Sequence, residues 1–89
     1  MYLGRITNYY PRPRVAEARL ETAERLRVGD RIMVTGATTG VYSGTADELR
    51  LEYDPVPEVG QGNLFSFPTT EPLHRGDKLY RIDTTIDEY

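Results

Sequence analysis

The stretch LRVGDRI, residues 26–32, recurs at residues 73–79 as LHRGDKL. In each copy an aliphatic residue precedes Gly-Asp, and a cation and a second aliphatic residue follow it. Glycine accepts a positive φ at low cost, and an aspartate carboxylate accepts hydrogen bonds from nearby backbone N–H groups. The pattern therefore predicts two tight turns, each leading into a β-strand. Gly-Asp is also common in unrelated turns, although the placement of the copies around a barrel-sized stretch favours a repeated unit.

Short apolar runs separated by turn residues make up most of the chain. The 89 residues include eight glycines and six prolines, which fall between these runs, and this punctuation is typical of an all-β domain. The expected strands span residues 2–10, 31–35, 41–53, 63–67 and 78–82. Residues 41–53 fit one long strand or two strands joined by a kink near Gly44, and residues 54–62 fit a loop.

Residues 15–28 (VAEARLETAERLRV) fit a helix and a strand equally well. Ala, Glu, Leu and Arg dominate this segment, and its apolar residues return at helical spacing. In a strand, by contrast, Ala16, Ala18 and Leu20 would point inward and the residues between them to solvent. Context routinely overrides propensity, so the residues alone leave the two alternatives tied.

Composition limits the chemistry that the chain can perform. It has no cysteine, which excludes disulfides, thiolate metal sites and a cysteine nucleophile. Its one histidine, His74, excludes a multi-histidine metal site and would need Ser43 or Ser66 as a nucleophile. Because His74 lies within the second Gly-Asp motif, we expect it to face solvent, and we expect a non-catalytic protein without a cofactor or metal. No apolar run approaches a membrane span, and the expected compartment is the cytoplasm.

The charge of the chain is uneven. Eleven Lys and Arg against fourteen Asp and Glu give a net charge of −3, yet the first fourteen residues contain no acid. Arginines that alternate with aromatic residues can hold phosphates and stack bases. The candidate contact residues for RNA or another partner are Arg5, Tyr9, Tyr10, Arg12 and Arg14. The alternative is structural, because tyrosines are good strand formers and arginines commonly decorate a solvated face.

Several segments, taken in order, resemble the C-terminal domain of peptidase family U32, the collagenase-like proteins. They are LGRITNYYP (residues 3–11), Val15-Ala16, residues 26–32, residues 36–39, residues 45–51, Pro55-Val56 and residues 75–80. Together these segments reach across residues 3–82. The chain departs from the family at Asn8, where His is frequent, in a longer connection over residues 21–25, and at Phe65, where a small residue is usual.

The resemblance implies a fold. The U32 C-terminal domain is similar to the second domain of elongation factor Tu, the translation-protein β-barrel, and it also occurs as free-standing elongation-factor-like proteins. The resemblance therefore favours a strand at residues 15–28 and implies a small closed or nearly closed β-barrel of about six strands. It also implies that any peptidase chemistry belongs to a separate barrel-type domain, which needs far more residues than this chain has.

These observations give one set of expectations. A single β-barrel domain is expected over residues 1–82 and an acidic tail over residues 83–89. The expected interior includes Ile6, Ala16, Ala18, Leu20, Ile32, Val34, Leu49, Leu51 and Leu79. The expected function is a non-catalytic accessory module that positions structured RNA, such as tRNA, or a collagenase-like catalytic domain, without DNA or membrane binding. The alternative is a fragment of a full-length U32 peptidase, although Met1 directly before the first strand favours a free-standing chain.

Overall fold

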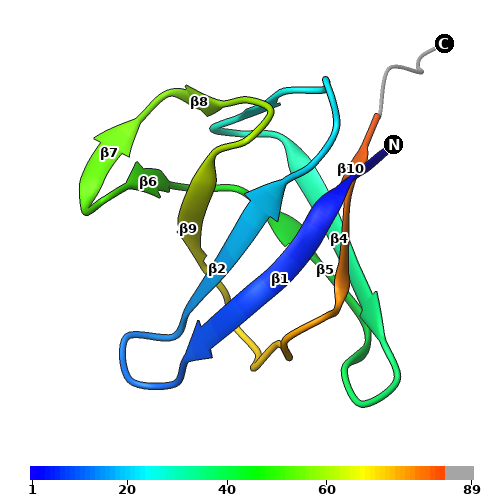
Figure 1. Ribbon diagram of the computed structural model, residues 1–89. Helices are drawn as coiled ribbons and strands as arrows, with labels where there is room; N and C mark the ends of the chain where they lie inside the picture. Colours follow the sequence, from blue (N-terminus) through cyan, green and yellow to red (C-terminus); the bar gives the residue numbers. More distant parts are fainter. Residues whose placement is uncertain (84–89) are drawn as a thin grey trace, which may run out of the picture.

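The computed structural model of the protein describes residues 1–83, and the regular structure in this part of the chain consists of β-strands (Figure 1). In chain order they are β1 (Tyr2–Tyr10), β2 (Val15–Leu20), β3 (Leu26–Arg27), β4 (Arg31–Gly36), β5 (Gly40–Thr45), β6 (Leu49–Leu51), β7 (Asp54–Val56), β8 (Glu58–Val59), β9 (Leu64–Pro68) and β10 (Lys78–Ile82). The expected all-β class is confirmed. Residues 1–83 contain no helix that is long and apolar enough to span a membrane. Apart from Asp83, the expected acidic tail lies outside the described residues.

Eight of the strands form one antiparallel sheet in the order β5-β4-β10-β1-β2-β9-β6-β7, and β3 pairs separately with β8. Figure 1 shows this sheet curling around its interior. The expected closed or nearly closed barrel of about six strands is not confirmed, because β5 and β7 are edges that do not pair with each other in the described part of the chain. After β5, Ala46 hydrogen-bonds to the turn before β4 rather than extending a ladder.

Residues 15–20 adopt the strand alternative and become β2, which lies between β1 and β9. Its inward residues, Ala16, Ala18 and Leu20, are fully buried. The two alanines lie directly opposite Phe67 and Phe65 on β9, so a small residue faces a large one across each pair. Two neighbouring strands complete the backbone hydrogen bonds of β2, and this tertiary pairing outweighs the helical propensity of its residues.

The first Gly-Asp motif forms a tight turn between β3 and β4. Gly29 has a φ of 98°, which favours glycine. The Asp30 carboxylate accepts the N–H of Arg27 at 2.8 Å, and the Asp30 N–H donates to the Arg27 carbonyl at 3.0 Å. The turn also bonds to one residue of a neighbouring segment: the Gly29 N–H donates to the Ala46 carbonyl, and the Ala46 N–H donates to the Asp30 carbonyl, both at 2.8 Å.

The second motif reproduces each of these contacts. Gly76 has a φ of 91°, and Asp77 accepts the N–H of His74 at 2.9 Å through its carboxylate. The residue that corresponds to Ala46 is Ile6. The Ile6 carbonyl accepts the Gly76 N–H, and the Ile6 N–H donates to the Asp77 carbonyl, both at 2.8 Å. The two predicted turns are confirmed, and their matching hydrogen bonds identify a repeated structural unit rather than two generic turns.

The repeat also organises the centre of the sheet. The strands that follow the two turns, β4 and β10, pair with each other, and Met33 lies opposite Tyr80. Met33 and Tyr80 occupy the same position relative to the Gly-Asp of their motifs. An approximate twofold axis therefore passes between them and relates the two turns.

The expected interior is buried, with one exception. Leu51 is half-buried at the margin of the core because β7, its neighbour in the hairpin, is an edge strand. The core also contains eight hydrophobic residues that were not expected, and most of these lie in turns, short strands or strand ends. They are Leu3, Leu26, Tyr42, Ala46, Val59, Phe65, Phe67 and Leu73.

Residues 41–62 depart from the expected boundaries. The break in the 41–53 segment falls at residues 46–48, between β5 and β6, and not at Gly44. Gly44 has a packing role instead, since a Cβ there would lie 2.9 Å from the Tyr42 hydroxyl oxygen. The expected loop at residues 54–62 contains β7 and β8, because it pairs with β6 and β3.

The two ends of the sheet-forming chain meet. The Met1 amino group donates to the Arg81 carbonyl at 3.1 Å, and the Arg81 N–H donates to the Met1 carbonyl at 2.9 Å. Figure 1 shows the N-terminus beside the end of β10. The first and last strands, β1 and β10, are thus neighbours in the sheet.

Candidate binding groove

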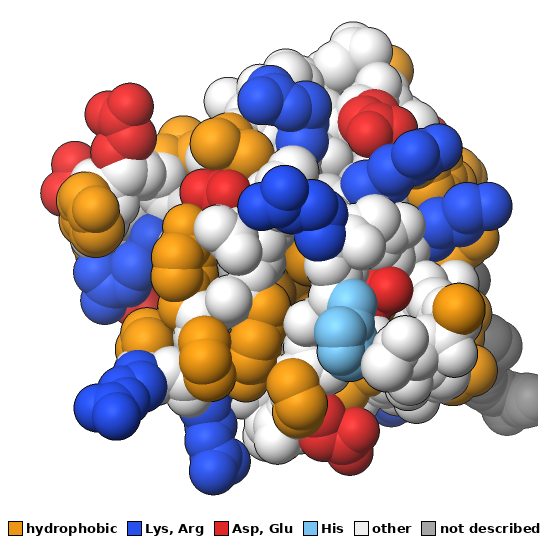
Figure 2. Space-filling view, turned by 60° about the horizontal axis from the view of Figure 1, so that its bottom comes forward, with side chains coloured by type: hydrophobic (Ala, Val, Ile, Leu, Met, Phe, Trp, Pro, Cys, Tyr) orange, Lys and Arg blue, Asp and Glu red, His pale blue; other side chains and the backbone are white. Residues whose placement is uncertain are grey.

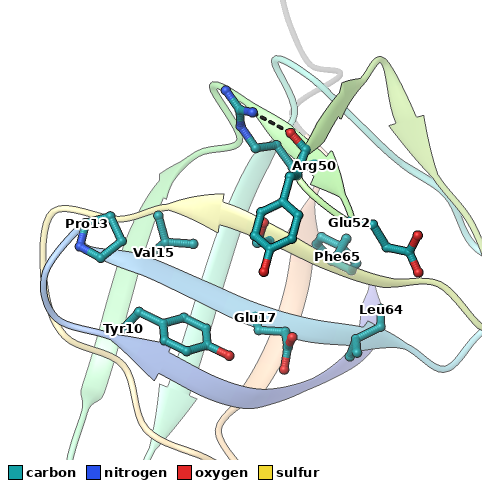
Figure 3. Close-up of a pocket in the computed structure, with 10 residues that line it drawn as sticks. Tyr10, Pro13, Val15, Glu17, Arg50, Glu52, Leu64 and Phe65 are labelled. Carbon is teal, nitrogen blue, oxygen red and sulfur yellow. Dashed lines mark hydrogen bonds between the residues drawn. The ribbon is translucent and has the colours of Figure 1, made fainter.

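An open groove of about 660 Å³ lies on the outer face of the sheet, over β2 and β9 (Figure 3). One wall is the end of β1 with the turn that follows it, and the other is the β6–β7 hairpin. Mostly apolar atoms line the groove, with a few polar groups among them, as in many ligand sites. The lining residues are Tyr10, Pro13, Val15, Glu17, Arg50, Glu52, Tyr53, Leu64, Phe65 and Ser66.

The β6–β7 hairpin holds an aromatic side chain at the rim of the groove. Only Glu52 and Tyr53 form its turn, and their φ angles are 49° and 77°. This left-handed conformation favours glycine or asparagine and costs other residues free energy. Arg50 braces the turn, because its Nη1 donates to the Tyr53 carbonyl at 2.6 Å. The Tyr53 side chain is 89% exposed, so a strained turn presents it to solvent.

The opposite side of the groove supplies further apolar contacts and one fixed carboxylate. Figure 3 shows Tyr10 and Leu64 near opposite ends of the groove, with Glu17 between them. Tyr10 and Leu64 are 42% and 41% exposed, so both present apolar surface to the groove. The Thr7 hydroxyl donates to the Glu17 carboxylate at 2.8 Å and fixes its position. The groove therefore offers aromatic faces, aliphatic surface and an oriented negative charge.

The structure brings together three of the five predicted contact residues. Arg12 and Arg14 are exposed in the β1–β2 turn, next to Tyr10 at the end of β1. Figure 2 brings the bottom of Figure 1 forward and shows basic side chains at the margin of an apolar patch. Tyr9 instead packs against the core, half-buried, and Arg5 lies in the middle of the sheet, away from the turn.

Two arginines have a raised pKa. Hydrogen bonding to Tyr2, and then the charge of Glu21, raises the pKa of the fully exposed Arg5 guanidinium. Hydrogen bonding to Asp83, and to a lesser degree to Glu24, raises the pKa of Arg81. Since arginine is already protonated at neutral pH, both side chains keep their charge throughout the physiological range.

His74 belongs to a hydrogen-bond cluster next to the second Gly-Asp turn. Its Nδ1 lies 2.7 Å from the Thr39 hydroxyl oxygen, and that hydroxyl also contacts the Asp77 carboxylate. Asp77 is only 5% exposed, and a Cβ at Gly36 would stand 1.9 Å from its Oδ1. Because Thr39 and Gly36 belong to the β4–β5 hairpin, the cluster fastens the second turn to that hairpin.

The described residues do not pair His74 with either predicted nucleophile. Its side-chain hydrogen bond is with Thr39 and not with Ser43 or Ser66. Across residues 1–83, no group of three or more His, Asp or Glu side chains is placed to hold a metal ion.

Sequence reasoning missed the β6–β7 side of the groove. Arg50, Tyr53 and Leu64 lie far along the chain from Tyr10, and only the sheet order brings them together. No sequence signal marks Tyr53, because the turn in LEYDP lacks the glycine or asparagine that its positive φ angles favour. The exposure of Leu64 follows from the alternation of β9, whose Phe65 and Phe67 point inward.

Curated relatives and solved structures agree on what this arrangement resembles. Over 83 residues, the chain is 40% identical to a collagenase of Porphyromonas gingivalis, and the match covers 93% of this chain. The solved C-terminal domain of a Geobacillus thermoleovorans protein described as a U32 peptidase superposes with a TM-score of 0.84 over 92% of each chain, at 14% identity. The resemblance to the U32 C-terminal domain is confirmed. A selenomethionine variant of that domain superposes with a TM-score of 0.82, at 15% identity.

The curated relatives are much longer than this chain. The chain spans 20% of the Porphyromonas collagenase, and it also spans 20% of an uncharacterized protease of Methanocaldococcus jannaschii, to which it is 27% identical over 84 residues. No protein-family model matches the chain. The match therefore concerns about a fifth of the length of these two proteins.

Proposed function

We propose that this U32-type domain is a non-catalytic accessory module that positions a partner in the groove over β2 and β9. The observation that carries the proposal is the strained Glu52-Tyr53 turn, which holds an exposed tyrosine over an apolar groove. Backbone strain of this kind clusters at functional sites. The match to one fifth of longer proteases supports an accessory role, in which catalysis belongs to another domain. The corresponding alternative is that the chain is a piece of such a protease.

Folded RNA is the leading partner. Arg12 and Arg14 project from the β1–β2 turn beside Tyr10, at one end of the groove. Cations next to exposed aromatic rings suit phosphates and unstacked bases. The net charge of −3 opposes non-specific binding of nucleic acid, so the contact is local and its affinity falls only gently with salt.

The test is a titration of labelled transfer RNA at two salt concentrations. The double variant Arg12→Ala/Arg14→Ala removes the charges of the turn, and Tyr53→Ala removes the opposite aromatic side chain. Both are expected to weaken binding, by about tenfold for the double variant if each arginine contributes one phosphate contact. A matched control, Arg27→Ala/Arg31→Ala, removes two exposed arginines outside the groove.

Equal binding by the double variant and the control would rule out RNA at this site, as would an absence of binding at low salt. A collagenase-like catalytic domain would then be the better partner, testable by pull-down with the same variants. Two related expectations accompany the proposal: likeness to the translation-protein barrel and a cytoplasmic location. The first rests on the family resemblance and the second on the cysteine-free composition.

A further inference from the structure

Three cations stand side by side across three neighbouring strands. Arg5 of β1 lies in register with Lys78 of β10 on one side and with Arg19 of β2 on the other. Residues directly opposite each other in antiparallel strands project from the same face of the sheet, about 5 Å apart. All three side chains are exposed. We call Lys78, Arg5 and Arg19 the cation row.

The cation row is an unfavourable arrangement by itself, because like charges directly opposite each other repel. Among the described residues, the five ion pairs all involve other cations. Two acids lie nearby and keep their charge: Glu21 accepts the Tyr2 hydroxyl at 3.0 Å and raises the pKa of Arg5, and Glu17 accepts the Thr7 hydroxyl. The charge of Glu21 offsets the row at Arg5, and an anionic partner would compensate the row further.

The cation row runs directly into the apolar end of the groove. Arg19 lies opposite Leu64 of β9, and Leu64 is 41% exposed and lines the groove. A molecule lying across the strands would thus meet an aliphatic surface and then three positive charges in succession. This order, an aliphatic surface and then three positive charges, fits a segment that carries an apolar group followed by several negative charges.

The surroundings favour a polypeptide over a nucleic acid. The end of the row is aliphatic, whereas single-stranded nucleic acid is recognised on aromatic platforms. Tyr2 and Tyr80, which lie opposite each other further along β1 and β10, pack edge to face with centroids 5.6 Å apart, and the Tyr2 hydroxyl is bound to Glu21. The net charge of −3 also opposes a long polyanion more than a short acidic segment.

We propose that the cation row and Leu64 dock an acidic polypeptide segment, with an apolar side chain against Leu64 and carboxylates on Arg19, Arg5 and Lys78. This inference goes beyond the function proposed above, because it concerns the cation row, which adjoins the groove at Leu64, and it does not use Arg12 or Arg14. The chain matches only a fifth of its curated relatives, so in those proteins other polypeptide is covalently available to such a face.

The test measures the binding of a fluorescein-labelled peptide, a glutamate run with leucine at one end, to the whole 89-residue protein by fluorescence anisotropy. The variant Arg5→Gln/Arg19→Gln removes two charges of the row, and Arg27→Gln/Arg31→Gln removes two exposed arginines outside it. The row variant is expected to bind about tenfold more weakly, and the control within about twofold of the parent. Added salt is expected to weaken parental binding.

A second arm uses labelled oligouridylate of the same net charge. Stronger, row-dependent binding of oligouridylate than of the peptide would overturn the proposal in favour of nucleic acid. Equal peptide binding by the row and control variants, or no parental binding at low salt, would overturn it outright. Circular dichroism of each variant checks that it is folded. A charge-reversed variant, Arg5→Glu/Arg19→Glu, is expected to bind a lysine-rich peptide in place of the glutamate peptide. Loss of RNA binding in Arg12→Ala/Arg14→Ala does not affect these outcomes.

Discussion

At the scale of single residues, the two turns of the repeat differ most at their aspartates. Asp30 is half-buried, and its carboxylate accepts the N–H of Arg27. Asp77 is buried, and its carboxylate accepts both the N–H of His74 and the Thr39 hydroxyl. A buried carboxylate is stable only if its hydrogen bonds are made, so the second turn depends more strongly on its aspartate than the first.

We expect Asp77→Ala to lower the free energy of unfolding by about 2–3 kcal/mol, because it leaves two partly buried donors, the Thr39 hydroxyl and the His74 N–H, without an acceptor. Asp30→Ala is the matched control, with an expected loss of about 1 kcal/mol, because solvent can replace the missing acceptor. Urea denaturation of both variants measures the difference. Equal losses would show that the additional hydrogen bond of Asp77 contributes nothing.

At the scale of the elements, β2 carries much of the stability of the sheet, because it joins β1 to β9 and buries Leu20 completely. Leu20→Ala is expected to cost roughly 2–5 kcal/mol through lost burial and the cavity that remains. Leu51→Ala, in the half-buried edge hairpin, is expected to cost clearly less. The far-UV circular dichroism spectrum should show little helix. A spectrum that requires a helix at residues 15–28 would contradict the strand assignment.

The β6–β7 turn gives a prediction that separates stability from binding. Replacing Glu52-Tyr53 by Asn-Gly suits the positive φ angles and is expected to raise the free energy of unfolding by about 1 kcal/mol. The same change removes the exposed ring and is expected to weaken partner binding. Glu52→Asn alone keeps Tyr53 and serves as the control in both measurements. Unchanged binding by the double variant would mean that Tyr53 is not a contact.

The same elements show what the sequence could predict. The Gly-Asp turns were predictable because glycine and aspartate define the local geometry themselves. The state of residues 15–28 was not, because Ala16, Ala18 and Leu20 fit both periodicities, and only pairing with Phe65 and Phe67 decides between them. Half of the groove was equally beyond reach, since Tyr53 and Tyr10 meet only through the order of strands in the sheet.

At the scale of the whole molecule, residues 1–83 form a fold similar to the U32 C-terminal domain. Within these residues, His74 bonds to Thr39 and not to a serine, and no group of three or more His, Asp or Glu side chains is placed to hold a metal ion. The purified chain is expected to show no activity against gelatin or casein, because His74 hydrogen-bonds to a threonine beside a structural carboxylate. The measurement compares the parent with His74→Ala in a zymogram and in solution. Activity that co-purifies with the chain and disappears in His74→Ala would contradict this prediction.

The meeting of Met1 and Arg81 has a consequence for how this fold can be used. Because both ends leave the sheet at one point, a host protein can accept the domain within a surface loop and continue its own chain almost where it stopped. For the same reason, a short linker could join the end of β10 to the start of β1, and new ends could be opened in an exposed turn such as residues 11–14. Such a circular permutant should keep the sheet, since β1 and β10 would remain neighbours.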